Sequence, residues 1–131
     1  MTKTSARYKL FSASSAFFIW GSWAYYINSV ESKAVGLVSG LTQGVASFII
    51  TLFVVYAVTK IYNALPESAW RLILPAILTV SCIAVCLVAI HTIAGTPRIL
   101  PTIAPSLSVA FLFCVFTAYK LSRTETNKLN G

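Results

Sequence analysis

VGLVSGLTQGVASFIITLFVVYAVTKIY, residues 35–62, is a long apolar run that contains one charged residue, Lys60. A helix that crosses a bilayer needs about 20 mainly apolar residues, so this run is long enough. Gly36, Gly40 and Gly44 recur every four positions and therefore form one narrow strip on a helix. We predict a membrane helix over 35–62 whose strip, a glycine zipper, lets a neighbouring backbone approach closely.

Three further runs have the same apolar character, at about 10–29, 69–93 and 99–121. The segments between them are short, and short connections make consecutive helices pack as antiparallel neighbours. The sequence therefore predicts an all-α integral membrane bundle of four transmembrane helices, arranged as two antiparallel hairpins. The whole chain, residues 1–131, is expected to form a single membrane domain.

The first run follows a basic segment and so resembles a secretory signal peptide. Aromatic residues, among them Trp20, Trp23 and Tyr26, stand where a small-residue cleavage site would be needed. We therefore interpret residues 10–29 as a retained span.

The charge pattern predicts the orientation of the chain. Only 10% of residues are charged and 57% are hydrophobic, whereas about 25% are charged in a typical soluble domain. Lys33 and Arg98 lie on one side of the predicted bundle. The other eight basic residues lie on the opposite side: Lys3, Arg7, Lys9, Lys60, Arg71, Lys120, Arg123 and Lys128. The positive-inside rule then places both termini in the cytoplasm. From the compactness of the sequence and its lack of eukaryotic sorting features, we expect a multi-pass protein of the bacterial inner membrane.

The net charge of +7 is spread between apolar runs and forms no nucleic-acid patch, so the basic residues are expected to contact membrane lipids. Small residues on the fourth run, Ser106, Ala110 and Cys114, recur every four positions and predict a second packing face. Cys82 and Cys86 share a helix face, which we interpret as another helix contact. These faces bury the interior of the bundle, or they bind a second copy or a larger membrane-protein partner.

Catalytic chemistry has little support in the sequence. Glu31, Glu67 and Glu125 all lie outside the predicted spans, and no catalytic or metal-binding motif is present. We therefore expect no enzymatic activity, no cofactor and no metal. The length and span number are similar to those of the small multidrug transporters, whose hallmark is a glutamate in the first membrane helix. Residues 10–29 contain no carboxylate, so this resemblance implies no shared activity.

One group of polar and aromatic residues suggests a ligand site near the outer ends of the spans. Trp23, Gln43, His91 and Arg98 suit an amphiphile with an anionic headgroup if the hairpins bring them together. The same residues also suit interfacial anchoring, which is the alternative interpretation.

The functional hypothesis is a non-enzymatic one. We expect a small inner-membrane accessory or structural subunit that acts through helix–helix packing. The alternative is a small oligomeric transporter or flippase for a lipid-linked or amphiphilic substrate.

Overall fold

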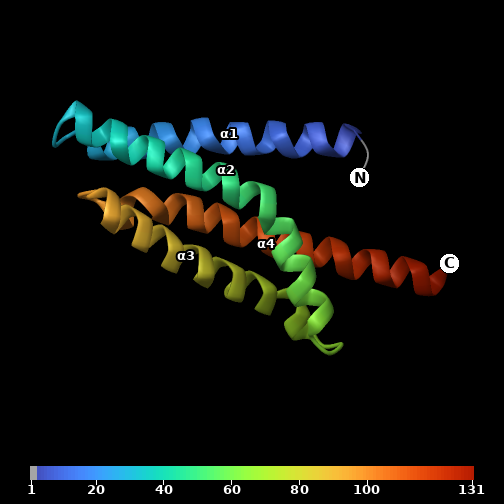
Figure 1. Ribbon diagram of the computed structural model, residues 1–131. Helices are drawn as coiled ribbons and strands as arrows, with labels where there is room; N and C mark the ends of the chain where they lie inside the picture. Colours follow the sequence, from blue (N-terminus) through green and yellow to red (C-terminus); the bar gives the residue numbers. More distant parts are fainter. Residues whose placement is uncertain (1–2) are drawn as a thin grey trace.

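The computed structural model describes residues 3–131, with the side chains of residues 5–131, and the regular secondary structure of this part is entirely helical (Figure 1). Its four α-helices are α1 (Lys3–Asn28), α2 (Lys33–Ala64), α3 (Leu74–Ala94) and α4 (Ile99–Asn130), and a short 3-10 helix, η1, covers Ala69–Leu72. α2, α3 and α4 are long and apolar enough to cross a membrane. α1 does not meet that criterion, because its serines, tyrosines and tryptophans lower its mean hydropathy.

Local sequence signals explain where the helices begin and end. Ser32 caps α2, since its Oγ accepts a hydrogen bond from the Val35 N–H over 3.1 Å. Gly95 ends α3 in the left-handed conformation, with φ at 76°, which glycine adopts without steric cost. The next residue, Thr96, donates its backbone N–H to the His91 carbonyl over 2.9 Å.

Three helix boundaries differ clearly from the sequence prediction, the first of them at Lys3, where α1 begins instead of near residue 10. The α-helix expected from residue 69 begins at Leu74 instead, after the 3-10 turn of η1. Pro75, in the first turn of α3, supplies no N–H donor, and at that position the missing donor interrupts no hydrogen bond within the helix, so the α-helix begins readily there. α4 continues beyond residue 121 to Asn130, because its polar C-terminal segment remains helical after the apolar run ends.

The helices form two antiparallel hairpins, α1–α2 and α3–α4, and both termini lie at the same end of the bundle (Figure 1). α2 starts beside α1 and then crosses toward α3 and α4, so it contacts all three other helices. Toward the termini, α1 and α2 diverge. α1 is thus held mainly through the half of its length that is remote from the termini.

Glycine residues allow that half of α1 to pack closely on α2. A Cβ placed on Gly40 would lie 2.9 Å from the Gly21 carbonyl oxygen, and a Cβ on Gly21 would lie 3.1 Å from the Gly40 oxygen. A Cβ on Gly44 would meet the ring and carbonyl of Phe17 at 3.1 Å. The two backbones are therefore so close that any side chain at these positions would separate them.

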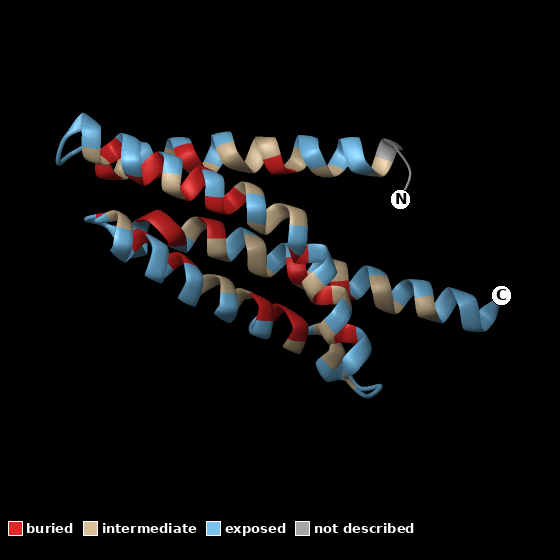
Figure 2. Cartoon of the chain, in the orientation of Figure 1, coloured by how far each residue is buried: buried red, intermediate tan, exposed pale blue. Residues whose placement is uncertain are grey.

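Buried residues lie on the helix faces that point toward one another (Figure 2). Near the termini, α2, α3 and α4 share a core that includes Val58, Ala76 and Cys114. Farther along, Leu87 and Ile103 form a second core with Ala46. Cys82 and Cys86 are exposed, so the helix contact predicted for them is not made within this chain.

Candidate functional site

A buried polar network connects α2, α3 and α4 in the half of the bundle remote from the termini. His91 is fully buried, and its Nε2 lies 2.7 Å from the Oε1 of Gln43, which is also fully buried. The other ring nitrogen, Nδ1, lies 2.7 Å from Thr96 Oγ1. Thr96 Oγ1 in turn accepts a hydrogen bond from Ser39 over 3.2 Å. Two of the four residues predicted to form a ligand site thus pair with each other.

The Gln43 amide extends the network to α4. Its Nε2 donates to the hydroxyls of Ser47 and Ser106, over 3.2 Å in each case. Ser106 in turn donates a hydrogen bond to the Ile103 carbonyl over 2.9 Å. Because the amide nitrogen faces these hydroxyls, the amide oxygen faces His91 and needs a donor there.

These contacts assign one tautomer to the imidazole. His91 Nε2 carries the hydrogen and donates to Gln43, while Nδ1 accepts from the Thr96 hydroxyl. Thr96 can donate because Ser39 supplies a hydrogen to its oxygen. With a neutral imidazole, each donor in the chain of hydrogen bonds therefore faces an acceptor. The network in this way links the helices to one another.

A second polar cluster joins α1 to the start of α4. Asn28 is fully buried and donates to Thr102 Oγ1 over 2.8 Å and to the Ala24 carbonyl over 2.8 Å. Its Oδ1 accepts the backbone N–H of Arg98 over 3.0 Å. Since the first N–H groups of a helix have no partner within that helix, Asn28 supplies from α1 one of the acceptors that α4 lacks.

Trp23 compensates for a proline in α4. Pro105 lies inside the helix and has no N–H, so the carbonyl four positions earlier, on Pro101, loses its usual donor. The Trp23 indole Nε1 donates to that carbonyl over 2.9 Å. This hydrogen bond ties α1 to α4 and satisfies a backbone group that would otherwise be unpaired in an apolar environment.

The other predicted site residues lie outside the buried network. Arg98 is exposed, and Trp23 is half-buried at the α1–α4 contact, so neither joins the Gln43–His91 pair. Of the predicted packing residues on α4, Ser106 belongs to the network and Cys114 to the core near the termini, while Ala110 is half-buried. Gly36, Gly40 and Gly44 are buried on α2, with Gly40 and Gly44 facing α1 and Gly36 facing Ser29 in the α1–α2 connection.

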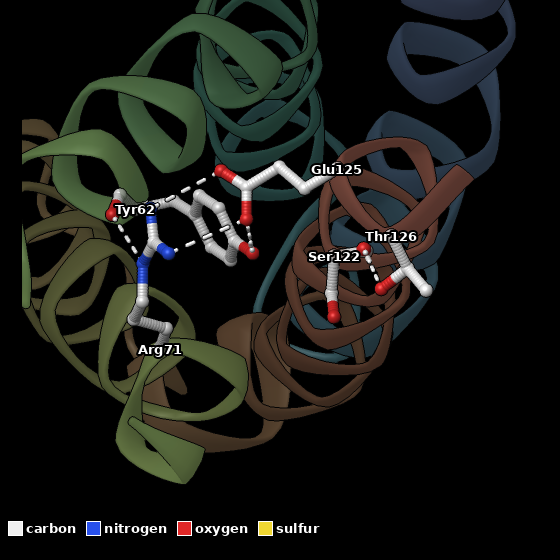
Figure 3. A network of polar contacts seen from close by, with 5 residues as sticks. All are labelled: Tyr62, Arg71, Ser122, Glu125 and Thr126. Atoms are coloured by element: carbon white, nitrogen blue, oxygen red, sulfur yellow. Dashed lines mark hydrogen bonds and ion pairs between the residues drawn. The ribbon is translucent and has the colours of Figure 1, made fainter. Parts of the chain in front are cut away.

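The opposite end of the bundle holds an ionic cluster that the sequence did not indicate (Figure 3). Arg71 in η1 pairs with Glu125 in α4 through its two terminal guanidinium nitrogens, each at 3.3 Å from a carboxylate oxygen. Tyr62 in α2 donates its hydroxyl to Glu125 over 3.1 Å, and Arg71 lies 4.1 Å above its ring. Arg71 Nε also donates to the Tyr62 carbonyl over 3.1 Å. We call these three residues the clasp.

The sequence does not indicate the clasp, because Glu125 lies beyond the apolar run that predicts the fourth span. Since α4 stays helical there, Glu125 lies one turn beyond Leu121 on a face that turns toward α2. Its spacing of seven from the buried Ala118 is the signal that could have revealed the contact.

Comparisons with protein-family models, with curated proteins and with solved structures find no match for this chain. Within the described residues, no group of three or more His, Cys, Asp or Glu side chains is arranged to hold a metal ion. The fold itself defines the class: an all-helical protein in which three helices are long and apolar enough to cross a membrane.

Proposed function

We propose that the protein is a four-span accessory or structural subunit of the bacterial inner membrane that acts without catalysis, by binding a partner's membrane helix. The binding surface is the outer side of the α1–α2 contact, which we call the seam. Its proposed partner is a larger membrane protein. Both termini are in the cytoplasm.

The packing of α1 supports a fourth span. α2 is apolar enough to cross a membrane, and α1 runs antiparallel to it with the Gly21 and Gly40 backbones in contact. A helix packed so closely along a membrane span shares the same hydrocarbon layer. The low hydropathy of α1 follows from its aromatic and serine content, and Trp and Tyr are favoured at membrane interfaces.

The observation that carries the accessory role is the shape of the seam. Two hollows lie along it, one of about 240 Å³ beside Gly21, Ser22 and Gly40, and one of about 290 Å³ beside Ser14 and Val45. Phe17 and Phe18 line both hollows. Hydrophobicity alone does not drive helices together in lipid, so hollows that a neighbouring helix can fill with its side chains favour association through dispersion contacts. The glycine zipper serves this surface by holding α1 and α2 together.

Photocrosslinking along the seam tests this role. A photoreactive residue is placed at Leu41 or Val45, which lie on the seam, and in a control at Val85, an exposed residue of α3. The proposal expects one discrete protein adduct from the seam positions and none from Val85. Two differently tagged copies of this chain are expressed together, so that an adduct carrying both tags identifies a homo-oligomer. Lipid adducts alone, or equal protein adducts from all three positions, would contradict a specific helix partner.

A second function, transport or flipping of an amphiphile, is favoured by a different feature. A cleft lies between α1 and α4, and the Gln43 and Ser106 side chains of the polar network form part of its wall. A path that combines apolar walls with hydrogen-bonding groups suits a molecule with both characters. Movement of a fluorescent lipid across liposomes that contain only this protein would favour transport. Movement no faster than in protein-free liposomes would contradict transport and favour the accessory role.

A further inference from the structure

Toward the termini, α1 diverges from the rest of the bundle (Figure 1). A cleft between α1 and α4 is lined on the α1 side by residues of this part of the helix, from Tyr8 to Trp20. Its volume is about 240 Å³, and residues from all four α-helices line it. The walls are mostly apolar, with Leu107 and Phe113 of α4 on one side and Ala16 of α1 on the other. In a bilayer this cleft is accessible to lipid.

Hydrocarbon suits the interior of the cleft better than water does. A water molecule needs two or more polar partners, and the Gln43 and Ser106 groups at the wall are already hydrogen-bonded to their neighbours. An empty apolar cleft would lose dispersion contacts along its walls. An acyl chain restores those contacts and leaves the hydrogen bonds of Gln43 and Ser106 intact.

One end of the cleft is charged. Lys9 of α1 is half-buried and lines the cleft together with the exposed Tyr8, near the end of the bundle that holds the termini. Trp20 lines the cleft farther along the same helix, about 16 Å away at 1.5 Å per residue. Arg7, two positions from Lys9, is exposed and does not line the cleft. The cleft thus combines a cationic end with an apolar channel of acyl-chain length.

The surroundings favour a negative headgroup over a zwitterionic one. Eight of the ten basic residues belong to the segments at this end, and so do two of the three glutamates, so positive charge is in excess there. One of those glutamates, Glu125, is paired with Arg71, and no carboxylate is among the described residues that line the cleft. Basic residues near a membrane surface attract anionic lipid by about 1 kcal/mol each.

We propose that this cleft binds one anionic glycerophospholipid, with its phosphate at Lys9 and Tyr8 and one acyl chain along the channel toward Trp20. The site is independent of the seam, which lies on other faces of α1 and α2. It therefore stands whether or not the seam binds a partner helix.

Native mass spectrometry of the full-length protein in mild detergent tests the site, with dioleoyl phosphatidylglycerol and dioleoyl phosphatidylcholine as probes. We expect one phosphatidylglycerol molecule to bind per chain, with an affinity about fivefold higher than that of phosphatidylcholine. Lys9→Gln should abolish this preference. Arg7→Gln removes the same charge from the same helix outside the cleft and should preserve it.

A second pair of variants tests the acyl-chain channel. Ala110→Phe fills the cleft from α4 and should remove the tightly bound lipid of either headgroup. Ala104→Phe adds the same ring to an exposed position of α4 outside the cleft and should leave binding unchanged. Size-exclusion chromatography confirms that each variant remains folded.

Three outcomes would overturn the proposal. Equal affinities for the two lipids would show that the cleft has no site for an anionic headgroup. An equal loss of preference in Arg7→Gln and Lys9→Gln would show diffuse surface attraction in place of a site. Dimers of the wild type that Ala110→Phe dissociates, with no bound lipid, would show that a second copy fills the cleft.

Discussion

The hydrogen bond from Trp23 to Pro101 shows how one residue in α1 compensates for a missing donor in α4. Trp23→Phe should lower the free energy of unfolding by about 1 kcal/mol, because the Pro101 carbonyl would lose its partner. In a Pro105→Ala background the alanine N–H can satisfy that carbonyl within the helix, so the same change should cost less. Equilibrium unfolding of the four proteins in detergent completes the double-mutant cycle.

Trp20→Phe is the matched control for this cycle, since it removes an indole from the same helix at the cleft wall. Trp20→Phe should lower the free energy of unfolding by the same amount whether position 105 is proline or alanine. An equal cost of Trp23→Phe in both backgrounds would show that the indole contributes through packing alone.

The Gln43–His91 pair should behave as a unit. Gln43→Leu leaves a buried imidazole nitrogen without its partner and should destabilise the protein by roughly 1–3 kcal/mol. Adding His91→Leu removes that unpaired group, so the double variant should lose less than the sum of the single losses. Thermal unfolding followed by circular dichroism measures each loss. Strict additivity would mean that the two side chains do not interact.

Within the α1–α2 hairpin, the backbone contact is the element that cannot accept a side chain. Gly40→Leu should separate the helices and weaken the hairpin by at least about 2 kcal/mol, since even a Cβ would lie 2.9 Å from the Gly21 oxygen. Ala34→Leu adds a leucine to an exposed position of the same helix and should be close to neutral. Unfolding in detergent compares the two. Similar stability for both variants would place Gly40 at a surface that only touches lipid.

The clasp holds the C-terminal part of α4 against η1 and α2. Glu125→Gln removes the charge that Arg71 contacts, and a partly exposed ion pair contributes up to about 1 kcal/mol. Amides in residues 122–130 should therefore exchange their hydrogens up to about fivefold faster. Glu67→Gln neutralises an exposed glutamate at the same end and should leave exchange there unchanged. Unchanged rates in Glu125→Gln would show that α4 is held by apolar contacts alone.

The sequence indicated some of these elements and not others, for physical reasons. Apolar runs and the four-residue glycine spacing are periodic within one helix, so they predicted four helices and the strip that includes Gly40 without any knowledge of neighbours. The Trp23–Pro101 bond and the clasp depend on the angle and rotation between helices, which composition does not determine. Gln43 and His91 were recognised as unusual, but their direct pairing needs the register of α2 against α3.

For the molecule as a whole, the position of α1 determines the topology. If α1 crosses the bilayer beside α2, the chain makes four spans and its two termini share one side of the membrane. If only α2, α3 and α4 cross, an odd number of spans places residues before α2 on the side opposite the C-terminus. The location of the N-terminus therefore separates the two topologies directly.

Epitope tags at the N-terminus and after Gly131, probed separately in intact and permeabilised bacterial spheroplasts, make this measurement. A third tag inserted between Val30 and Glu31, in the α1–α2 connection, reports the external side. The four-span account predicts that both terminal tags are protected in intact spheroplasts and detected only after permeabilisation, while the Val30–Glu31 tag is detected in both. An N-terminal tag that is detected in intact spheroplasts, with a protected C-terminal tag, would contradict it.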